Sequence, residues 1–317
     1  MRLRPTDRQT NPSELSPGSW ARFAAPWRIE SLSDKHYENF PVASWLSPPA
    51  LRPAVMAIYR FARTADDIAD EGDAPAADRL ADLAAFRSDL DAVAAALPPS
   101  QRWPQVFGPL AATMTEYRLP PELLVALLNA FAQDVVKSRY ADRVELLDYC
   151  RRSAEPVGRL LLHLYGMAEP RALMQSDAIC TALQLANFWQ DLGVDTRRGR
   201  IYAPQADCRR HGVDPAELLA GHDGPAVRAL VGDLVGWARE LMLSGADLVH
   251  TVPGRAGLEL RLVVQGGLRI LEKIDRLGGA TLATRPVVGA ADAPVLAWRA
   301  LLMRAGRSIA ANEGRAA

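Results

Sequence analysis

The sequence predicts an all-α fold, a single helical bundle arranged around a central cavity. Apolar residues recur at the spacing of a helix face in most segments of the chain, and no segment shows the alternation typical of strands. With 317 residues, of which 49% are hydrophobic, the chain is long enough to bury a large core. The repeated amphipathic patterns favour one large domain over two small ones.

The first expected helix covers 54–71. Val55, Ile58 and Phe61 recur on one face at helical spacing, while the charged residues of this segment fall on a different face. Gly72 is expected to end the helix, because glycine readily takes the backbone conformation found just after a helix.

Prolines, serines and glycines mark the ends of the later helices. Pro75 and Pro121 are expected to begin two helices, and Ser176 to cap another that frays near Gly193. Pro156 lies within an apolar segment, where it predicts a kink. The expected helices cover 54–71, 73–97, 119–140, 142–166, 176–195, 225–248, 253–277 and 292–311, and 101–117 gives a weaker helical pattern.

Composition limits the classes of function. Lys+Arg and Asp+Glu number 37 each and no basic block occurs, so nucleic acid is not an expected partner. The three cysteines lack paired C-x-x-C spacing and are interpreted as reduced thiols. The N-terminus has no apolar core of signal-peptide length, and nowhere does an apolar run reach the length of a membrane span, so we expect a cytoplasmic protein. Residues 1–20 are interpreted as a disordered lead-in, followed by one domain over 21–317.

One stretch concentrates charge inside an otherwise apolar, alanine-rich run. On a helix, Arg63, Asp66 and Asp70 form one stripe, with Asp67 and Glu71 beside it. Like charges at that spacing repel by roughly 0.2–0.5 kcal/mol per pair, and by more where they are desolvated. A cation is therefore expected to offset them. Arg63 is a candidate, either as a diphosphate ligand or only as an ion-pair partner of its neighbours.

A second acidic motif repeats the Asp-x-x-x-Asp spacing. Gln184, Asn187, Asp191 and Asp195 share one helical stripe flanked by apolar residues, which indicates a lined cavity. Two aspartate pairs facing each other across that cavity would offer the oxygen ligands that suit Mg2+ shared with a substrate phosphate. An isolated pair usually means a solvated helix face, but two pairs with such neighbours favour a magnesium-diphosphate site.

Two further candidates are open to a second interpretation. Tyr149 is a catalytic candidate, although a tyrosine at helical spacing is more often part of the core. Arg197, Arg198 and Arg200 follow the second aspartate pair and either hold phosphate or line a solvated loop. The residues alone leave both questions open.

Four motifs occur in order along the chain. They are HYENF (36–40), AVMAIYRFARTADDIADE (54–71), YCRRSAEPVG (149–158) and QLANFWQDLGVDTRRGRIYAP (184–204). Together they resemble the squalene and phytoene synthase family of head-to-head prenyl synthases, and the likeness runs from about residue 35 to residue 285. The resemblance implies an isoprenoid-synthase-type bundle whose cavity holds long prenyl chains, with both aspartate pairs binding Mg2+ and substrate diphosphate.

Within that family, HxENFPVAS, YCRRSAEPVG and NFWQDLGVD look most like the hydroxysqualene synthases of the bacterial hopanoid pathway, which convert presqualene diphosphate to hydroxysqualene. Glu38 with Asn39, and Arg151 with Arg152, stand where phytoene and dehydrosqualene synthases have other residues. Gln190 replaces the arginine that precedes their second aspartate pair. We therefore expect the second pair to lack its usual cation, which favours one bound diphosphate over two.

The resemblance also implies partners. Mg2+ is the expected cofactor and presqualene diphosphate the expected substrate, and no reductant is needed. The oily substrate implies peripheral contact of a cytoplasmic protein with a membrane, and the pathway implies partnership with a presqualene diphosphate synthase and a squalene-forming oxidoreductase. Two alternatives stay open: a presqualene diphosphate or phytoene synthase that condenses two prenyl diphosphates, and a non-catalytic assembly protein with the family fold.

The candidate residues fall into three groups. The catalytic candidates are Asp66, Asp70, Asp191, Asp195, Arg63 and Tyr149. The metal-ligand candidates are Asp66, Asp70, Asn187, Asp191 and Asp195. The substrate-binding candidates are His36, Asn39, Arg63, Gln184, Asn187 and Arg200.

Overall fold

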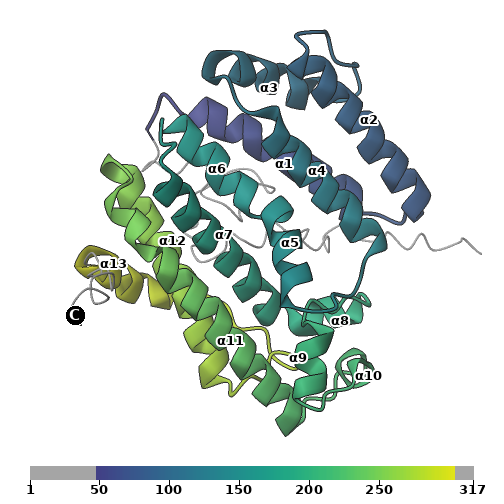
Figure 1. Cartoon of the computed structure of the whole chain (residues 1–317), viewed down its shortest axis with the longest axis vertical. Helices are drawn as coiled ribbons and strands as arrows, with labels where there is room; N and C mark the ends of the chain where they lie inside the picture. Colours follow the sequence, from purple (N-terminus) through teal and green to yellow (C-terminus); the bar gives the residue numbers. More distant parts are fainter. Residues whose placement is uncertain (1–47, 304–317) are drawn as a thin grey trace, which may run out of the picture.

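The computed structural model describes residues 48–303, and within that range helices are the only regular elements (Figure 1). The all-α prediction is confirmed. The helices are α1 (Arg52–Asp70), α2 (Ala76–Ala94), α3 (Pro104–Tyr117), α4 (Pro121–Val136), α5 (Arg143–Ser153), α6 (Glu155–Leu164), α7 (Pro170–Gln190), α8 (Leu192–Arg197), α9 (Gln205–Arg210), α10 (Pro215–Leu219), α11 (Pro225–Gly245), η2 (Ala246–His250), α12 (Gly254–Arg276), η3 (Ala290–Asp292) and α13 (Ala293–Leu302). The predicted lead-in 1–20 and the end of the predicted helix 292–311 lie outside the described residues.

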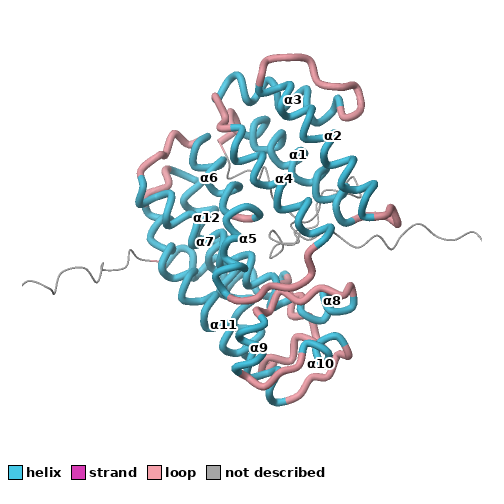
Figure 2. Tube along the Cα trace, turned by 45° about the vertical axis from the view of Figure 1, so that its right-hand side comes forward, coloured by secondary structure: helices cyan, strands magenta, loops and turns pink. Residues whose placement is uncertain are grey.

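The helices form two packed groups that share the central helices of the chain (Figures 1 and 2). Helix α1 packs against α2, α3 and α4, and α7 packs against α11, α12 and α6. Helices α5 and α6 lie between the groups, because α5 contacts both α4 and α7, and α6 contacts the same two helices. This arrangement brings the end of α1 and the end of α7, which carry the two acidic motifs, to neighbouring parts of the bundle.

An aromatic cluster fixes α1 to its neighbours. Phe61 of α1 lies 5.2 Å from Phe86 of α2 between ring centroids, and Phe86 lies 4.7 Å from Phe107 of α3. All three rings are buried, and Trp103 packs edge-on against Phe86. Rings in such tilted and edge-on contacts contribute roughly 0.5–1.5 kcal/mol per pair beyond the area they bury. The charged face of α1 is therefore held in one orientation by the apolar face opposite it.

The predicted kink at Pro156 is a complete break between α5 and α6. The chain leaves helical geometry at Ala154, whose φ and ψ are −120° and −52°. Proline has no backbone N–H to continue the ladder, so α6 begins anew with Pro156 in its first turn. Gly158 then allows a close approach to α7, because an added Cβ there would lie 2.3 Å from the Ser176 hydroxyl oxygen.

The prediction that Ser176 caps the second acidic helix is wrong. Helix α7 begins six residues earlier at Pro170, and Ser176 lies buried inside it. The same helix ends at Gln190, so the second motif spans a junction at Asp191 between α7 and the short α8. The helix expected over 119–140 ends at Val136. No prediction was made for the short helices α9 and α10, which have too few residues to show a periodic pattern.

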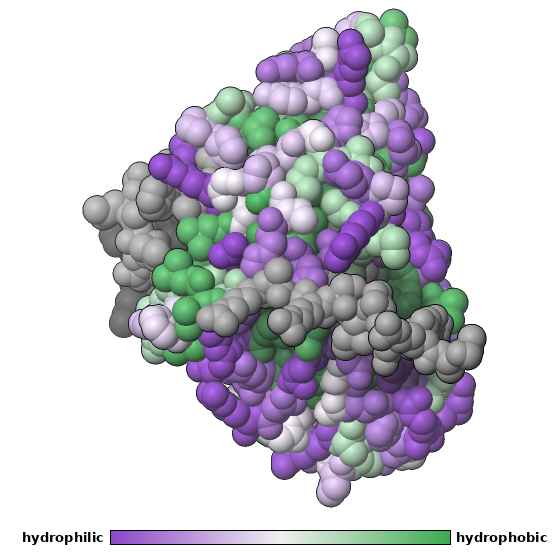
Figure 3. All heavy atoms as spheres, turned by 60° about the vertical axis from the view of Figure 1, so that its left-hand side comes forward, coloured by the Kyte–Doolittle hydropathy of each residue, from purple (hydrophilic) through white to green (hydrophobic). Residues whose placement is uncertain are grey.

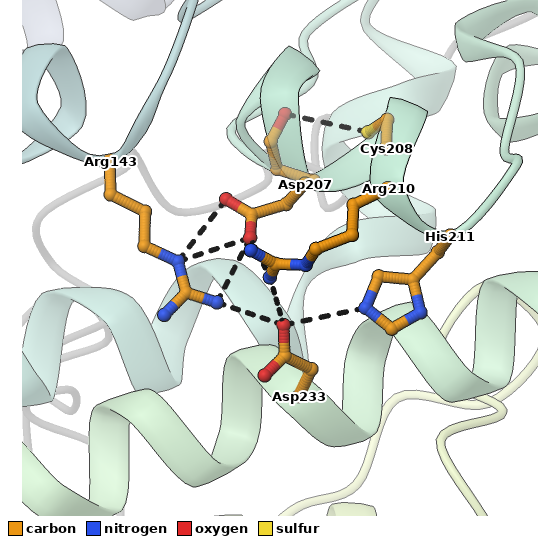
Figure 4. A network of polar contacts seen from close by, with 7 residues as sticks. Arg143, Asp207, Cys208, Arg210, His211 and Asp233 are labelled. Atoms are coloured by element: carbon orange, nitrogen blue, oxygen red, sulfur yellow. Dashed lines mark hydrogen bonds and ion pairs between the residues drawn. The ribbon is translucent and has the colours of Figure 1, made fainter.

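Helix α9 is anchored by a network of charges (Figure 4). Arg143 of α5 lies 2.9 Å from Asp207 of α9 and 2.9 Å from Asp233 of α11, and Arg210 contacts both carboxylates. His211 lies 3.4 Å from Asp233. Asp207 is buried, so its charge requires these arginines. The network joins three helices and fixes the chain that follows the second acidic motif.

Gly193 is expected to be required by packing, because an added Cβ would lie 2.3 Å from the carbonyl oxygen of Leu282. Backbone cannot move aside as cheaply as a side-chain tip, so Gly193→Ala is expected to lower the free energy of unfolding by about 1–3 kcal/mol. The matched control is Gly232→Ala in α11, where an added Cβ would meet no atom within 4 Å apart from the backbone of its own helix, and helix propensity predicts a gain of about 0.5–1 kcal/mol. Urea denaturation measures both, and equal effects would contradict the close contact.

Candidate active site

The two acidic motifs are joined by arginines that follow α8. Asp70, at the end of α1, lies 3.1 Å from Nη1 of Arg198, and its other carboxylate oxygen contacts Arg200. The backbone N–H groups of Arg198 and Arg200 donate to the carbonyl oxygen of Asp195 at 3.0 and 2.9 Å. The turn after the second motif therefore presents its cations to the first motif. The structure brings Asp70, Asp195 and Arg200 into one neighbourhood.

Arg63 offsets the remaining acidic charge of α1. Its Nη2 lies 2.6 Å from both Asp67 and Glu71, and its Nη1 lies 3.8 Å from the buried Asp66. Burial raises the pKa of Asp67 from 3.8 to about 7, an effect that Arg63 opposes and Glu71 adds to. The ion-pair interpretation of Arg63 is the one seen in this structure, and the predicted cation for this stripe is present.

Asp134 of α4 lies at the centre of this polar neighbourhood. Its carboxylate accepts a hydrogen bond of 2.6 Å from the hydroxyl of Tyr149, and its backbone carbonyl accepts one of 3.4 Å from Arg200. Burial raises the pKa of Asp134 from 3.8 to about 7. Tyr149 and Arg200 oppose this increase, while the negative charges of Asp70 and Asp195 add to it. A buried carboxyl group that titrates near neutrality is thus held beside both acidic motifs.

Sequence analysis missed Asp134, although a signal for it existed. Leu127, Ala130 and Phe131 lie on the buried face of α4, and Asp134 continues that face at helical spacing. A carboxylate at a core position of an apolar helix is rare unless it is paired. That pattern marks it as a candidate for a functional or ion-paired residue.

Tyr149 lies in an aromatic layer next to Asp134. Its ring centroid is 5.4 Å from that of Tyr140 and 6.1 Å from that of Tyr202, and Tyr202 stacks on Phe188 at 3.8 Å. Burial, together with the neighbouring Asp134, raises the pKa of Tyr149 well above its ordinary value, so the hydroxyl stays protonated and donates. The ring of Tyr149 is part of the core, and its hydroxyl contacts the buried acid, while a catalytic role for this residue stays a prediction.

The expected lack of a cation at the second aspartate pair is wrong. Arg285, in the segment after α12, donates a hydrogen bond from Nε to Asp191, whose second oxygen accepts from Asn187 at 3.2 Å. Gln190 points elsewhere and donates to the carbonyl oxygen of Pro286 at 2.7 Å. The charge that Gln190 lacks is supplied from a segment 94 residues away in the chain, which the local sequence could not show.

Gln184 of the second acidic motif and the arginine pair of the YCRRSAEPVG motif lie in different surroundings. Gln184 is buried, and its Oε1 has no hydrogen-bond partner among the described residues. Arg151 and Arg152 both pair with Asp148, and Arg152 also donates to Gln133 at 2.9 Å. The two arginines therefore offset charge on the outer side of α5, whereas Gln184 presents a polar atom inside the bundle.

A pocket of 210 Å3 opens beside Asp70. It is lined by Ala69, Asp70, Ala76, Arg79, Val135 and Arg200. Arg79 of α2, which sequence analysis also missed, donates to the carbonyl oxygens of Ala69 at 2.9 Å, Gly72 at 2.5 Å and Ala74 at 2.8 Å. These carbonyls belong to the last turn of α1 and the loop after it, so Arg79 fixes the end of the helix that carries the first motif.

The candidate metal ligands have the chemistry that Mg2+ requires, but they are not gathered around one point. Carboxylate and amide oxygens are its usual protein ligands. Among residues 48–303, no group of three or more His, Cys, Asp or Glu side chains is placed to hold a metal ion. Instead, Arg198 and Arg200 contact one aspartate motif and Arg285 the other. His36 and Asn39 lie outside the described residues.

Comparison with known proteins identifies the family. The sequence pattern of the Squalene/phytoene synthase family matches residues 33–292. The chain belongs to this family. A hydroxysqualene synthase of Rhodopseudomonas palustris is 34% identical over 240 residues, which cover 75% of this chain and 80% of that protein. A phytoene synthase of Thermus thermophilus is 32% identical over 274 residues, 84% of this chain and 87% of that protein.

A solved structure from the same family supports the fold. The crystal structure of squalene synthase HpnC from Alicyclobacillus acidocaldarius is similar with a TM-score of 0.71 and 37% identity, covering 77% of this chain and 90% of that one. Family members of this type act in isoprenoid synthesis, so the buried aspartates and arginines form the candidate active site of such an enzyme. The family match also includes His36 and Asn39. Within the part of the chain that is described, no helix is long and apolar enough to cross a membrane.

Asp134 is expected to make stability depend on pH. Its folded pKa of about 7 lies above the unfolded value of 3.8, so its proton favours the folded state fully below about pH 4, and this contribution is lost as pH rises to about 7. Asp134→Asn does not titrate and should flatten that decline in the free energy of unfolding. Tyr149→Phe removes the hydrogen bond that lowers this pKa and should extend the decline to higher pH. Urea denaturation between about pH 4 and pH 8 checks both variants, and an unchanged slope in Asp134→Asn would contradict the assignment.

Proposed function

We propose that this enzyme ionises presqualene diphosphate in a Mg2+-dependent reaction and captures the rearranged carbocation with water, forming hydroxysqualene and diphosphate. Family membership supports chemistry on a prenyl diphosphate. The similarity to a hydroxysqualene synthase supports the narrower reaction, as do the motifs around Asn39 and Arg152. The phytoene synthase relative is nearly as similar, so the choice between one substrate and two depends on the site and on experiment.

The observation that carries the proposal is the buried Asp134 between the two aspartate motifs. At neutral pH a carboxyl group with a pKa near 7 is present in both protonation states, which suits a group that accepts a proton from an attacking water molecule. Tyr149 holds this carboxylate by its 2.6 Å hydrogen bond. Water capture of a carbocation releases one proton, and we propose that Asp134 receives it.

The aspartates are proposed to hold the metal. Bound Mg2+ would supply charge that stabilises the leaving diphosphate and lowers the barrier to cleavage of the C–O bond. The residues that would hold it are Asp66, Asp70, Asn187, Asp191 and Asp195.

The arginines are proposed to hold the diphosphate. Arg198, Arg200 and Arg285 contact the aspartates in this structure. With those carboxylates engaged as metal ligands, the guanidinium groups would be available to bind the phosphate oxygens, for which their fork of donors is well suited. The arginines would thus exchange one set of anionic oxygens for another, without an uncompensated charge inside the bundle.

The surroundings of Asp134 support control of the cation. The rings of Tyr149, Tyr202 and Phe188 are buried and packed on one another beside it. Such a dry aromatic layer limits entry of stray water, which would otherwise quench the cation at the wrong carbon. Asp134, held beside this layer by the Tyr149 hydroxyl, is proposed to select where water attacks.

The two alternatives make different demands. Condensation of two prenyl diphosphates requires cations for both, and Arg285 restores a cation at the second pair, so charge there no longer argues against this reaction. A non-catalytic assembly protein would have no reason to keep two aspartate motifs whose like charges repel one another. The product experiment separates the two enzymatic reactions.

Purified protein with Mg2+ and presqualene diphosphate, without a nicotinamide cofactor, is expected to release diphosphate and form hydroxysqualene. In ¹⁸O-labelled water the hydroxyl should carry the heavy oxygen, because solvent water captures the cation. Mass spectrometry of the extracted products measures both results. Formation of presqualene diphosphate from farnesyl diphosphate, with no alcohol from added presqualene diphosphate, would overturn the proposal in favour of a condensing enzyme.

Asp66→Asn and Asp191→Asn are each expected to lower turnover at least about 100-fold while the helical fold is retained, because each removes a proposed metal ligand and one of several repelling charges. The control is Asp89→Asn, a buried carboxylate of α2 that accepts hydrogen bonds from Ser100 and belongs to neither motif. Circular dichroism and a product assay at limiting Mg2+ test the set. Near-normal turnover in either motif variant would show that its aspartate is not a metal ligand.

A further inference from the structure

Arg79 of α2 is a half-buried cation that has no role in the reaction proposed above. Its three side-chain nitrogens each donate one hydrogen bond to a backbone carbonyl, those of Ala69, Gly72 and Ala74. Such carbonyls at a helix end carry partial negative charge but are neutral groups. Among residues 48–303, no carboxylate forms an ion pair with Arg79. Its positive charge is therefore uncompensated within the part of the chain that the structure describes.

Exposed charge alone does not make a binding site. Hydrophilic side chains cover much of the face drawn in Figure 3, so a half-buried arginine is an ordinary feature of this surface. The other arginines near the first aspartate motif, Arg63, Arg198 and Arg200, each pair with a carboxylate. Capping of the helix end accounts for three of the five N–H groups of the Arg79 guanidinium, one on each nitrogen. One N–H group on each terminal nitrogen is left over.

The pocket beside Asp70 places Arg79 where an anion can reach it. Arg79 and Arg200 line this pocket of 210 Å3 together with Asp70 and three apolar side chains. Two guanidinium groups against one carboxylate leave a net positive charge in the wall of the pocket. Arg200 already pairs with Asp70, so the excess charge belongs to Arg79. The pocket is therefore suited to an anion that adjoins the first aspartate motif.

We propose that Arg79 binds the diphosphate of the substrate through the two N–H groups that its carbonyl contacts leave over. Two N–H groups on one planar guanidinium match two oxygens of a phosphate group. Arg198, Arg200 and Arg285 would each exchange an aspartate for a phosphate oxygen, whereas no carboxylate among residues 48–303 holds Arg79. Its backbone contacts also fix the side chain before binding, which reduces the entropy lost when the anion binds. The inference rests on the proposed function only in that the substrate carries a diphosphate.

Calorimetric titration of the full chain with inorganic diphosphate in the presence of Mg2+ tests this contact without any prenyl substrate. Arg79→Gln is expected to lower the affinity for diphosphate at least about tenfold, because it removes charge-assisted hydrogen bonds. Arg79→Lys keeps the charge but lacks the planar fork, so its loss of affinity should be smaller. Wild-type affinity in Arg79→Gln would overturn the proposal.

Gly72→Ala is the matched control for a purely structural role of Arg79. Gly72 has a φ of +77°, which a residue with a Cβ adopts only with strain. The change therefore weakens the same end of α1 but leaves the guanidinium group in place. Its affinity for diphosphate should match that of wild type. An equal loss in Gly72→Ala and Arg79→Gln would show that Arg79 acts only as a helix cap, which contradicts the proposal.

Ala76→Asp repeats the test should circular dichroism show Arg79→Gln unfolded. Ala76 lines the same pocket and is the first residue of α2, where an aspartate suits the helix N-terminus. The added carboxylate should repel diphosphate, so wild-type affinity in the folded variant would also count against the proposal. The product assay with presqualene diphosphate separates the two proposals. Absence of hydroxysqualene alongside a tenfold loss in Arg79→Gln refutes only the reaction, and normal product with unchanged diphosphate affinity refutes only the role of Arg79.

Discussion

Burial of carboxylates between apolar helices is the constraint on which the rest of this site depends. A carboxylate that loses water must be paired with a cation or take up a proton. Arg63 forms an ion pair with Asp67 within α1. Arg200, in the turn after α8, pairs with Asp70, and Arg285, in the segment after α12, pairs with Asp191. Three distant parts of the chain are thus drawn to one region because the acidic motifs would otherwise be unstable there.

Asp134 shows the second way to meet the same constraint. Its carboxylate forms no ion pair among residues 48–303, and burial raises its pKa to about 7. Tyr149 stabilises it through a hydrogen bond, and the tyrosine in turn is held by a layer of stacked rings. Asp134 therefore meets the constraint by taking up a proton more readily than an ordinary carboxyl group, without an ion-pair partner of its own. The proposed capture of a carbocation by water would benefit from one such group among many paired charges.

Carboxylates are also paired with arginines away from the candidate active site, where the pairing has a structural role. Arg143 and Arg210 compensate Asp207 and Asp233 and so join α5, α9 and α11. That network has no adjacent aspartate motif and is explained by its structural role. Buried charge alone therefore does not identify a catalytic centre. What distinguishes the candidate active site is the meeting of two repeated acidic motifs, a buried acid with a raised pKa and several arginines paired with the aspartates.

The sequence by itself determined the helical class, most helix positions and the two acidic motifs, because helical periodicity and the Asp-x-x-x-Asp spacing are local properties of the chain. It also identified Arg63, Tyr149 and Arg200 as candidates, and its motifs pointed to the family. Only the tertiary structure decided that Asp134 stands between the motifs and that Arg285 replaces the cation absent at Gln190. These are contacts between helices and loops far apart in the chain, and their partners are chosen by packing and by charge compensation, which no local pattern records.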